Sequence, residues 1–190
     1  TQGQPIYNMD TGQMEGGPGG PPPGESAYGP ASRTAGEAMQ DMQNMRGSVI
    51  LHNPTWEHRF WDIEAIASLG LNYDEMLKQY LAPVHVAEVV RLIVIQKFGG
   101  IYLDCDMEVI RPLDSLLEHK AFAAIQDGSG QVCNAAFGAE PYNPWIDWQL
   151  SHVMEYFRKD QPWSVSLMTA ACIQASKHVT LVPTDTFYPW

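Results

Sequence analysis

Residues 83–106 read PVHVAEVVRLIVIQKFGGIYLDCD, and this stretch decides the expected fold class. Apolar residues recur in it at helical spacing, at Val86, Val90, Ile93, Val94 and Phe98. Pro83 suits the first turn of a helix, and Gly99-Gly100 is typical of a helix end. The apolar run 101–103 that follows favours a β-strand. A helix, a glycine stop and an apolar strand make half of an α/β unit, so the stretch predicts an α/β fold.

Two carboxylates, Asp104 and Asp106, follow this strand. Residues two apart in an extended chain point the same way, which would place both acids on a polar face and Cys105 on the buried face as an inert thiol. The two acids would then lie roughly 7 Å apart at a strand end, where ligands of α/β sheets bind. Hard oxygen donors there suit Mg²⁺ or Mn²⁺ and leave positions open for a diphosphate. Plain solvation of both acids is the simpler alternative.

Strands and helices alternate along residues 47–190, which predicts a mixed sheet with helices on both faces. Strands are expected at 48–51, 56–61, 101–103, 121–125, 135–139 and 180–182. Helices are expected at 62–69, 83–98, 114–118, 144–157 and 164–176.

Residues 1–46 differ from the rest of the chain and are interpreted as a Gly/Pro-rich flexible tail or linker. The segment 16–24 holds only glycine and proline and has nothing to bury. A polyproline ligand for a partner domain is the alternative interpretation. Within the tail, residues 35–46 are compatible with a short Met-rich helix. The globular domain is therefore expected over 47–190.

Composition sets further limits on function. The chain has 190 residues, of which 45% are hydrophobic and 17% charged, so it can fill a core. Its 22 acidic and 11 basic side chains give a net charge of −11, which disfavours nucleic acids and anionic membranes as partners. The cysteines show no CxxC pair, and Arg91 and Gln96-Lys97 interrupt the apolar runs, so no zinc knuckle and no transmembrane segment are expected. The first residue, Thr1, indicates a processed chain or a fragment.

Three motifs together resemble the DXD glycosyltransferases of family 32. That family includes yeast-type α-mannosyltransferases and bacterial capsule enzymes, and it is related to the glucosyltransferase domains of large clostridial toxins. The motifs are AEVVRL at 87–92, KFGGIYLDCD at 97–106 and RPL at 111–113. The resemblance is strongest over 84–118 and weaker over 53–62 and 187–189.

The resemblance implies a GT-A-like fold, a UDP- or GDP-hexose donor, Mn²⁺ or Mg²⁺ as cofactor, and retention of anomeric configuration. It assigns Asp106 and Asp104 to the metal, with Asp104 also on the ribose or donor sugar, and Arg91 to donor hydroxyls or phosphate. Asp104, Asp106 and Arg91 form the implied catalytic set. Glu88 stands where the family usually has Asp, and it shares a helix face with Arg91, so both could reach the donor. Asn134 resembles an asparagine near the donor sugar. A helix-surface salt bridge between Glu88 and Arg91, and a turn role for Asn134, are the alternatives.

The implied function is a metal-dependent glycosyltransferase, with mannosyltransferases among its relatives, that moves a hexose to a hydroxyl of a glycan or lipid-linked acceptor. The first strand and the C-terminal His-Trp segment of the family are missing, so we expect a domain truncated at both ends. The alternative is a non-catalytic nucleotide-sugar-binding relic or an interaction module. The resemblance fits both a Golgi lumen and a bacterial cytoplasm and assigns no location.

Overall fold

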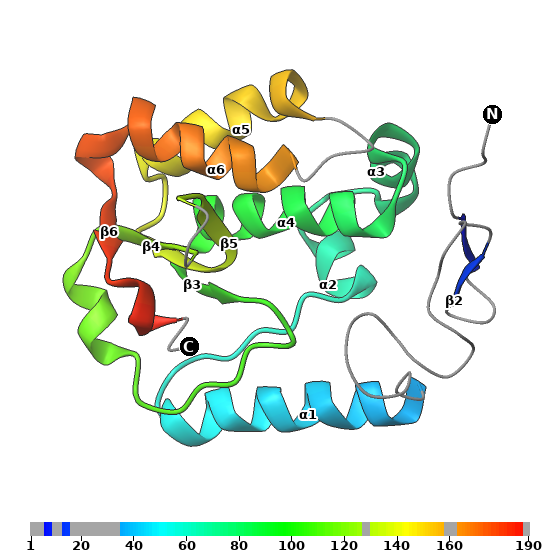
Figure 1. Ribbon diagram of the computed structural model, residues 1–190, viewed down its shortest axis with the longest axis horizontal. Coiled ribbons are helices and arrows are strands. Elements are labelled where there is room, and N and C mark those ends of the chain that lie inside the picture. The colour runs from blue at the N-terminus through cyan, green and yellow to red at the C-terminus, as the bar shows by residue number, and fades with distance from the viewer. Residues whose placement is uncertain (1–5, 9–12, 16–34, 127–129, 158–162, 188–190) are drawn as a thin grey trace. The chain divides into compact units, whose positions relative to one another are not determined.

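A computed structural model of the chain describes residues 6–8, 13–15, 35–126, 130–157 and 163–187 (Figure 1). The chain divides into two compact units, Thr1–Asp41 and Met42–Trp190. In the first unit, β1 (Ile6–Asn8) pairs antiparallel with β2 (Gln13–Glu15). Within the segment predicted as a Gly/Pro-rich tail, 1–46, residues 1–5, 9–12 and 16–34 lie outside the described residues.

Helix α1 (Ala35–His52) runs through the boundary expected at residues 46 and 47. It confirms the Met-rich helix, but the strand expected at 48–51 is wrong because the same helix continues through that segment. Asn53 follows the last helical residue, and its backbone N–H and its side-chain amide both donate to the carbonyl of Val49. The strand expected at 56–61 is also absent; this described segment is a turn followed by irregular chain.

Three helices lead to the sheet. Asp62 caps α2 (Ile63–Ser68) by accepting a hydrogen bond from the backbone N–H of Ala65 at 2.8 Å, and this confirms the expected short helix. Helix α3 (Tyr73–Tyr80) was not predicted; Asn72 caps it. Helix α4 (Pro83–Phe98) begins at its proline and ends at Gly99, as expected.

None of the helices in the described ranges combines the length and hydropathy needed to cross a membrane.

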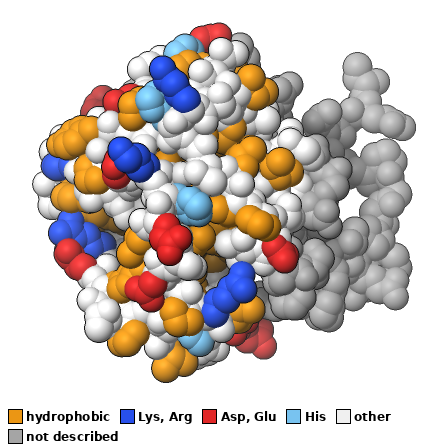
Figure 2. All heavy atoms as spheres, turned by 90° about the vertical axis from the view of Figure 1, so that its left-hand side faces the viewer, with side chains coloured by type: hydrophobic (Ala, Val, Ile, Leu, Met, Phe, Trp, Pro, Cys, Tyr) orange, Lys and Arg blue, Asp and Glu red, His pale blue; other side chains and the backbone are white. Residues whose placement is uncertain are grey.

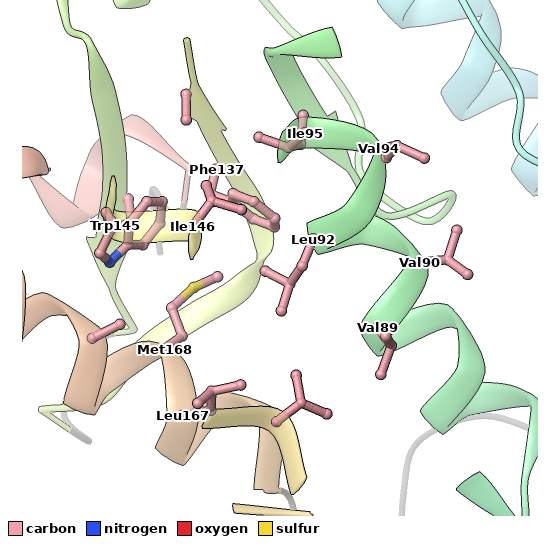
Figure 3. Close-up of a cluster of buried hydrophobic side chains, with 14 of the residues drawn as sticks. Val89, Val90, Leu92, Val94, Ile95, Phe137, Trp145, Ile146, Leu167 and Met168 are labelled. Atoms are coloured by element: carbon pink, nitrogen blue, oxygen red, sulfur yellow. The ribbon is translucent and has the colours of Figure 1, made fainter. Parts of the chain in front are cut away.

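Helix α4 is buried on more than one side. Figure 3 shows Leu92 pointing toward Phe137 and Met168, whereas Val90 and Val94 lie on another side of the helix. Both valines are buried as well, and α3 packs against α4. A helix that is apolar nearly all round is typical of the interior of a fold. More of helix α4 is therefore buried than the apolar spacing of residues 86–98 predicted. The last position of that pattern, Phe98, is an exception and is 40% exposed.

Four strands form a mixed sheet in the order β3-β5-β4-β6. Strands β3 (Gly100–Leu103) and β4 (Ala121–Ile125) both pair antiparallel with β5 (Val132–Ala139), which starts three residues earlier than expected. Strand β6 (Thr180–Val182) pairs parallel with β4. The α/β class and the mixed sheet are confirmed.

Alternate residues of β4 enter two separate cores. Ala121 and Ala123 belong to the larger core, to which α4, α5 (Pro144–Tyr156) and α6 (Trp163–Gln174) contribute. Phe122 and Ala124 belong to a smaller core on the other face. The long helices thus cover one face (Figure 1), and the short 3-10 helices cover the other. These short helices are η1 (Asp114–Glu118) and η3 (Thr184–Thr186), while η2 (Ser176–His178) leads into β6.

The charge of the surface is mixed. Figure 2 shows acidic, basic and apolar side chains interspersed over one face of the molecule. The negative net charge of the chain therefore does not gather into one patch on this face.

Gly99 sets the direction in which the chain leaves α4 for β3. It has φ +66°, and an added Cβ would lie 2.6 Å from Cδ of Pro141. We expect Gly99→Ala to lower the free energy of unfolding by about 1–3 kcal/mol through backbone strain and overpacking. Thermal unfolding followed by circular dichroism measures this loss.

Gly47→Ala is the matched control for Gly99→Ala. Gly47 lies within α1, and a Cβ added there would meet nothing within 4 Å. Because alanine is the better helix former by about 1 kcal/mol, this variant should be as stable as the parent or more stable. A Gly99→Ala protein that melts with the parent would contradict the close approach at Pro141.

Candidate active site

The site lies where β3 ends and β5 begins, beside the middle of α4. The backbone N–H of Asp104 donates to the carbonyl of Ala135 at 2.8 Å and continues the pairing of the two strands. The chain then turns, since the N–H of Met107 donates to the carbonyl of Asp104 at 3.1 Å. The alternation of faces predicted for residues 101–108 therefore stops at Asp104. Asp106 projects from the turn with an exposed side chain, whereas Asp104 is half-buried.

Cys105 was expected to be buried, and this prediction is wrong. The turn replaces the extended backbone on which the prediction depended, and Cys105 lies exposed between the two acids. Partial burial, followed by the charges of Asp106 and Asp104, raises the pKa of its thiol. The thiol therefore stays protonated at neutral pH and is a weak nucleophile, although it is accessible.

Arg91 is the charged centre of the site. It comes from the middle of α4 and is only 7% exposed. Its Nη1 donates to the backbone carbonyl of Asn134 on β5 at 2.7 Å and lies 3.2 Å from Oδ1 of Asp104. The guanidinium also covers the ring of Tyr102, with Cζ 4.8 Å from the ring centroid. Arg91 was expected to reach the donor from the wall of a cleft; the structure instead shows its side chain buried beside Asp104.

Tyr102 holds the same carboxylate from the strand. Its hydroxyl donates to Oδ1 of Asp104 at 2.7 Å. Burial is the largest cause of a raised pKa of Tyr102, with Arg91 opposing the rise and Asp104 adding to it. The hydroxyl therefore remains a donor at any physiological pH. Arg91 and Tyr102 together orient one oxygen of Asp104 before any ligand binds.

Glu88 lies one turn before Arg91 on α4, and its partners are His85 on the same helix and Ser164 on α6. The hydroxyl of Ser164, on α6, donates to Oε1 of Glu88. Nδ1 of His85 lies 2.9 Å from Oε2. The surface salt bridge considered for Glu88 and Arg91 is not among the ion pairs of the described residues, where Glu88 pairs with His85.

Asn134 connects the two halves of the site. Its carbonyl accepts from Arg91, and its side-chain amide donates to Oγ of Ser164 at 2.8 Å. The structure therefore brings Arg91, Glu88, Asp104 and Asn134 into one network, while Asp106 lies at its exposed edge. Three polar residues of the network were not predicted: His85, Tyr102 and Ser164. The spacing of His85 before Glu88 and of Tyr102 before Asp104 was an available signal, but Ser164 had none.

The carboxylate oxygens of Asp104 and Asp106 fit a divalent cation whose other ligands come from a substrate and from water. Within the described ranges, no group of three or more His, Cys, Asp or Glu side chains could hold a metal. Two carboxylates are enough for Mg²⁺ or Mn²⁺ when substrate phosphates and water complete the shell. Asp106 and the outer oxygen of Asp104 are the residues that would hold such an ion.

Comparison with known proteins shows which family and which enzymes this sequence resembles. Residues 38–123 match the family described as glycosyltransferase sugar-binding region containing DXD motif. The chain is 32% identical over 105 residues to inositol phosphoceramide mannosyltransferase 3 of Schizosaccharomyces pombe, a match that covers 53% of this chain and 29% of the relative. It is 31% identical over 126 residues to human lactosylceramide 4-alpha-galactosyltransferase, covering 58% of this chain and 33% of the relative.

A solved structure, PaToxG glycosyltransferase, matches 70% of this chain and 52% of its own with a TM-score of 0.46 and 14% identity. The sequence matches span about a third or less of the two curated relatives named above. Both of these matches and the family description agree with the resemblance found in the sequence. Residues 38–123, less than half of this chain, thus resemble the sugar-binding region, containing a DXD motif, of glycosyltransferases.

Proposed function

We propose that this chain carries the donor-binding part of a metal-dependent glycosyltransferase, which moves a hexose from a UDP- or GDP-sugar to a hydroxyl acceptor with retention of configuration. The observation that carries the proposal is the paired carboxylate turn at the end of β3. Asp104 is oriented there by Arg91 and Tyr102, and Asp106 is open to solvent.

The two acids have different parts in this proposal. Asp106 and the outer oxygen of Asp104 would hold Mn²⁺ or Mg²⁺, and the ion, when bound, neutralises the charge that develops on a departing diphosphate. Arg91 is too deeply buried to act as a mobile clamp. It serves by holding Asp104 in one orientation, so that little rearrangement is needed when the donor arrives. Tyr102 assists by donating a hydrogen bond to the same oxygen, Oδ1 of Asp104.

The acceptor is proposed to be a glycan or a lipid-linked sugar. Two of the relatives carry names of enzymes that act on inositol phosphoceramide and on lactosylceramide. Their donors are named as mannosyl and galactosyl groups, which leaves both GDP-mannose and UDP-galactose as donors to test. A ceramide-linked acceptor is therefore the first acceptor class to offer.

The direct test is a donor screen on the full chain. Calorimetry with GDP-mannose, UDP-galactose and UDP-glucose, each with Mn²⁺ and with EDTA, should reveal one donor whose binding needs the metal. Release of the nucleotide diphosphate, with and without a lactosylceramide acceptor, then reports turnover. Metal-dependent binding without turnover would instead favour the non-catalytic relic, and failure of every nucleotide sugar to bind would refute the proposal.

A further inference from the structure

A closed ring of polar contacts joins three elements around the site, and part of it has no role in the function proposed above. Glu88 and Arg91 lie on α4, Ser164 on α6 and Asn134 on β5. Asn134 donates from its side chain to Ser164, Ser164 donates to Glu88, and Arg91 donates to the carbonyl of Asn134. The backbone turn of α4 between residues 88 and 91 closes the ring.

Each bond in this ring has a defined direction. The oxygen of Ser164 accepts from Asn134 and has one hydrogen, which it gives to Glu88. Ser164 is 6% exposed, and the side chain of Glu88 is 12% exposed. Water therefore cannot easily replace either partner. If the hydroxyl were removed, an oxygen of Glu88 and an N–H of Asn134 would lose their partner in a buried place.

His85 closes the other side of the Glu88 carboxylate, but in a less defined way. Its Nδ1 lies 2.9 Å from Oε2 of Glu88 and 3.0 Å from Nε1 of Trp163, which can only donate. One ring nitrogen cannot both give a proton to Glu88 and accept one from Trp163. The bond from Ser164 is therefore the one that determines where the carboxylate lies.

We infer that Ser164, through this ring, is a positioning residue of the donor site: it holds Glu88 and Asn134 in place and thereby fixes Arg91 against Asp104. The inference rests on the proposed function. It gives Glu88 a different part from the one the family resemblance implied. Both of its oxygens face protein partners, so Glu88 acts within the scaffold and does not contact the donor sugar.

The test compares two hydroxyls on α6 that both bond to β5, the buried one of Ser164 and the half-buried one of Thr169. Ser164→Ala removes the ring hydroxyl. Thr169→Val is the matched control, since Oγ1 of Thr169 also joins α6 to β5, by accepting from the N–H of Val132 at 2.9 Å. Both variants should melt a few degrees below the parent. We expect Ser164→Ala to weaken metal-dependent donor binding about tenfold. Thr169→Val should leave the affinity within about twofold of that of the parent. Ser164→Thr, which keeps a hydroxyl, should retain most of the affinity.

Two results would overturn the inference separately from the proposed function. If the parent binds a nucleotide sugar and Ser164→Ala binds it equally well, the positioning role is refuted while the function stands. If the parent binds none, the function fails and the positioning role fails with it.

A thermal-stability cycle tests the ring itself without any ligand. The losses caused by Glu88→Ala and Ser164→Ala should combine to less than their sum, because each variant already breaks the same bond. Strictly additive losses would show that the bond contributes nothing and would refute the ring.

Discussion

Asp106→Asn is expected to weaken metal-dependent binding of the nucleotide-sugar donor by about a hundredfold, equivalent to about 2.8 kcal/mol. The amide keeps the size of the carboxylate but loses the charge that holds a hard cation. Asp106 is exposed and follows the end of β3, so the fold should not depend on it. Calorimetry with the donor and Mn²⁺ measures the affinity, and a thermal melt measures the stability of the fold.

Asp74→Asn is the matched control, because Asp74 is an exposed acid in the first turn of α3 and the substitution changes net charge by the same amount. It should bind donor as the parent does. If Asp106→Asn keeps full affinity in the presence of Mn²⁺, or if the control loses as much, Asp106 is not a metal ligand.

Arg91→Leu should destabilise the protein by about 2–4 kcal/mol and also abolish donor binding. The substitution removes the cation beside Oδ1 of Asp104 and the hydrogen-bond donor to the carbonyl of Asn134. Because Arg91 is buried, water cannot easily replace either contact. For a chain of this length the loss corresponds to a fall in Tm of about 4–16 °C. Differential scanning calorimetry and donor titration on the same sample provide the two values.

Arg91→Lys separates charge from geometry at this position. Lysine keeps the positive charge but cannot contact Asn134 and Asp104 with a planar fork. It also removes Nε, which is buried with no partner among the described residues. We expect a smaller loss of stability than for leucine and at least about a tenfold loss in kcat/KM, equivalent to about 1.4 kcal/mol.

Lys97→Leu, an exposed cation on the same helix, is the control for both Arg91 variants. It should leave donor affinity unchanged and the melting temperature close to that of the parent. An Arg91→Leu protein that melts and binds like this control would show that the buried contacts of Arg91 contribute nothing.

Local patterns predicted the central elements of the fold well. Pro83, Gly99 and the apolar run after it mark α4, its end and β3 without reference to any other part of the chain. Strand β4, helix α5 and strand β6 were likewise expected near their observed positions, because each has a period or a boundary residue of its own.

The strand expected at 48–51 failed for a reason outside that segment. Val49 and Ile50 are typical strand residues, yet α1 continues through them. Ser48 accepts from the backbone N–H of Val109 at 2.9 Å, and Asn53 accepts from that of Leu113 at 2.9 Å. These partners are about 60 residues away, and they tie the end of α1 to the chain that follows the Asp104 turn. Intrinsic preference is weaker than such long-range contacts.

The sequence by itself determined the helix, the glycine stop and the strand that end at Asp104, because helical periodicity, glycine conformation and β-branching act between near neighbours. It also determined the family resemblance and the pair of acids. Only the tertiary structure decided that Arg91 is buried behind Asp104, that Cys105 is exposed, and that Glu88 meets Ser164 rather than Arg91. The exposure of Cys105 follows from the turn that begins at Asp104. The contacts of Arg91 and Glu88 depend on hydrogen-bond partners 30 to 76 residues apart, and no local pattern encodes which buried donor will find which acceptor.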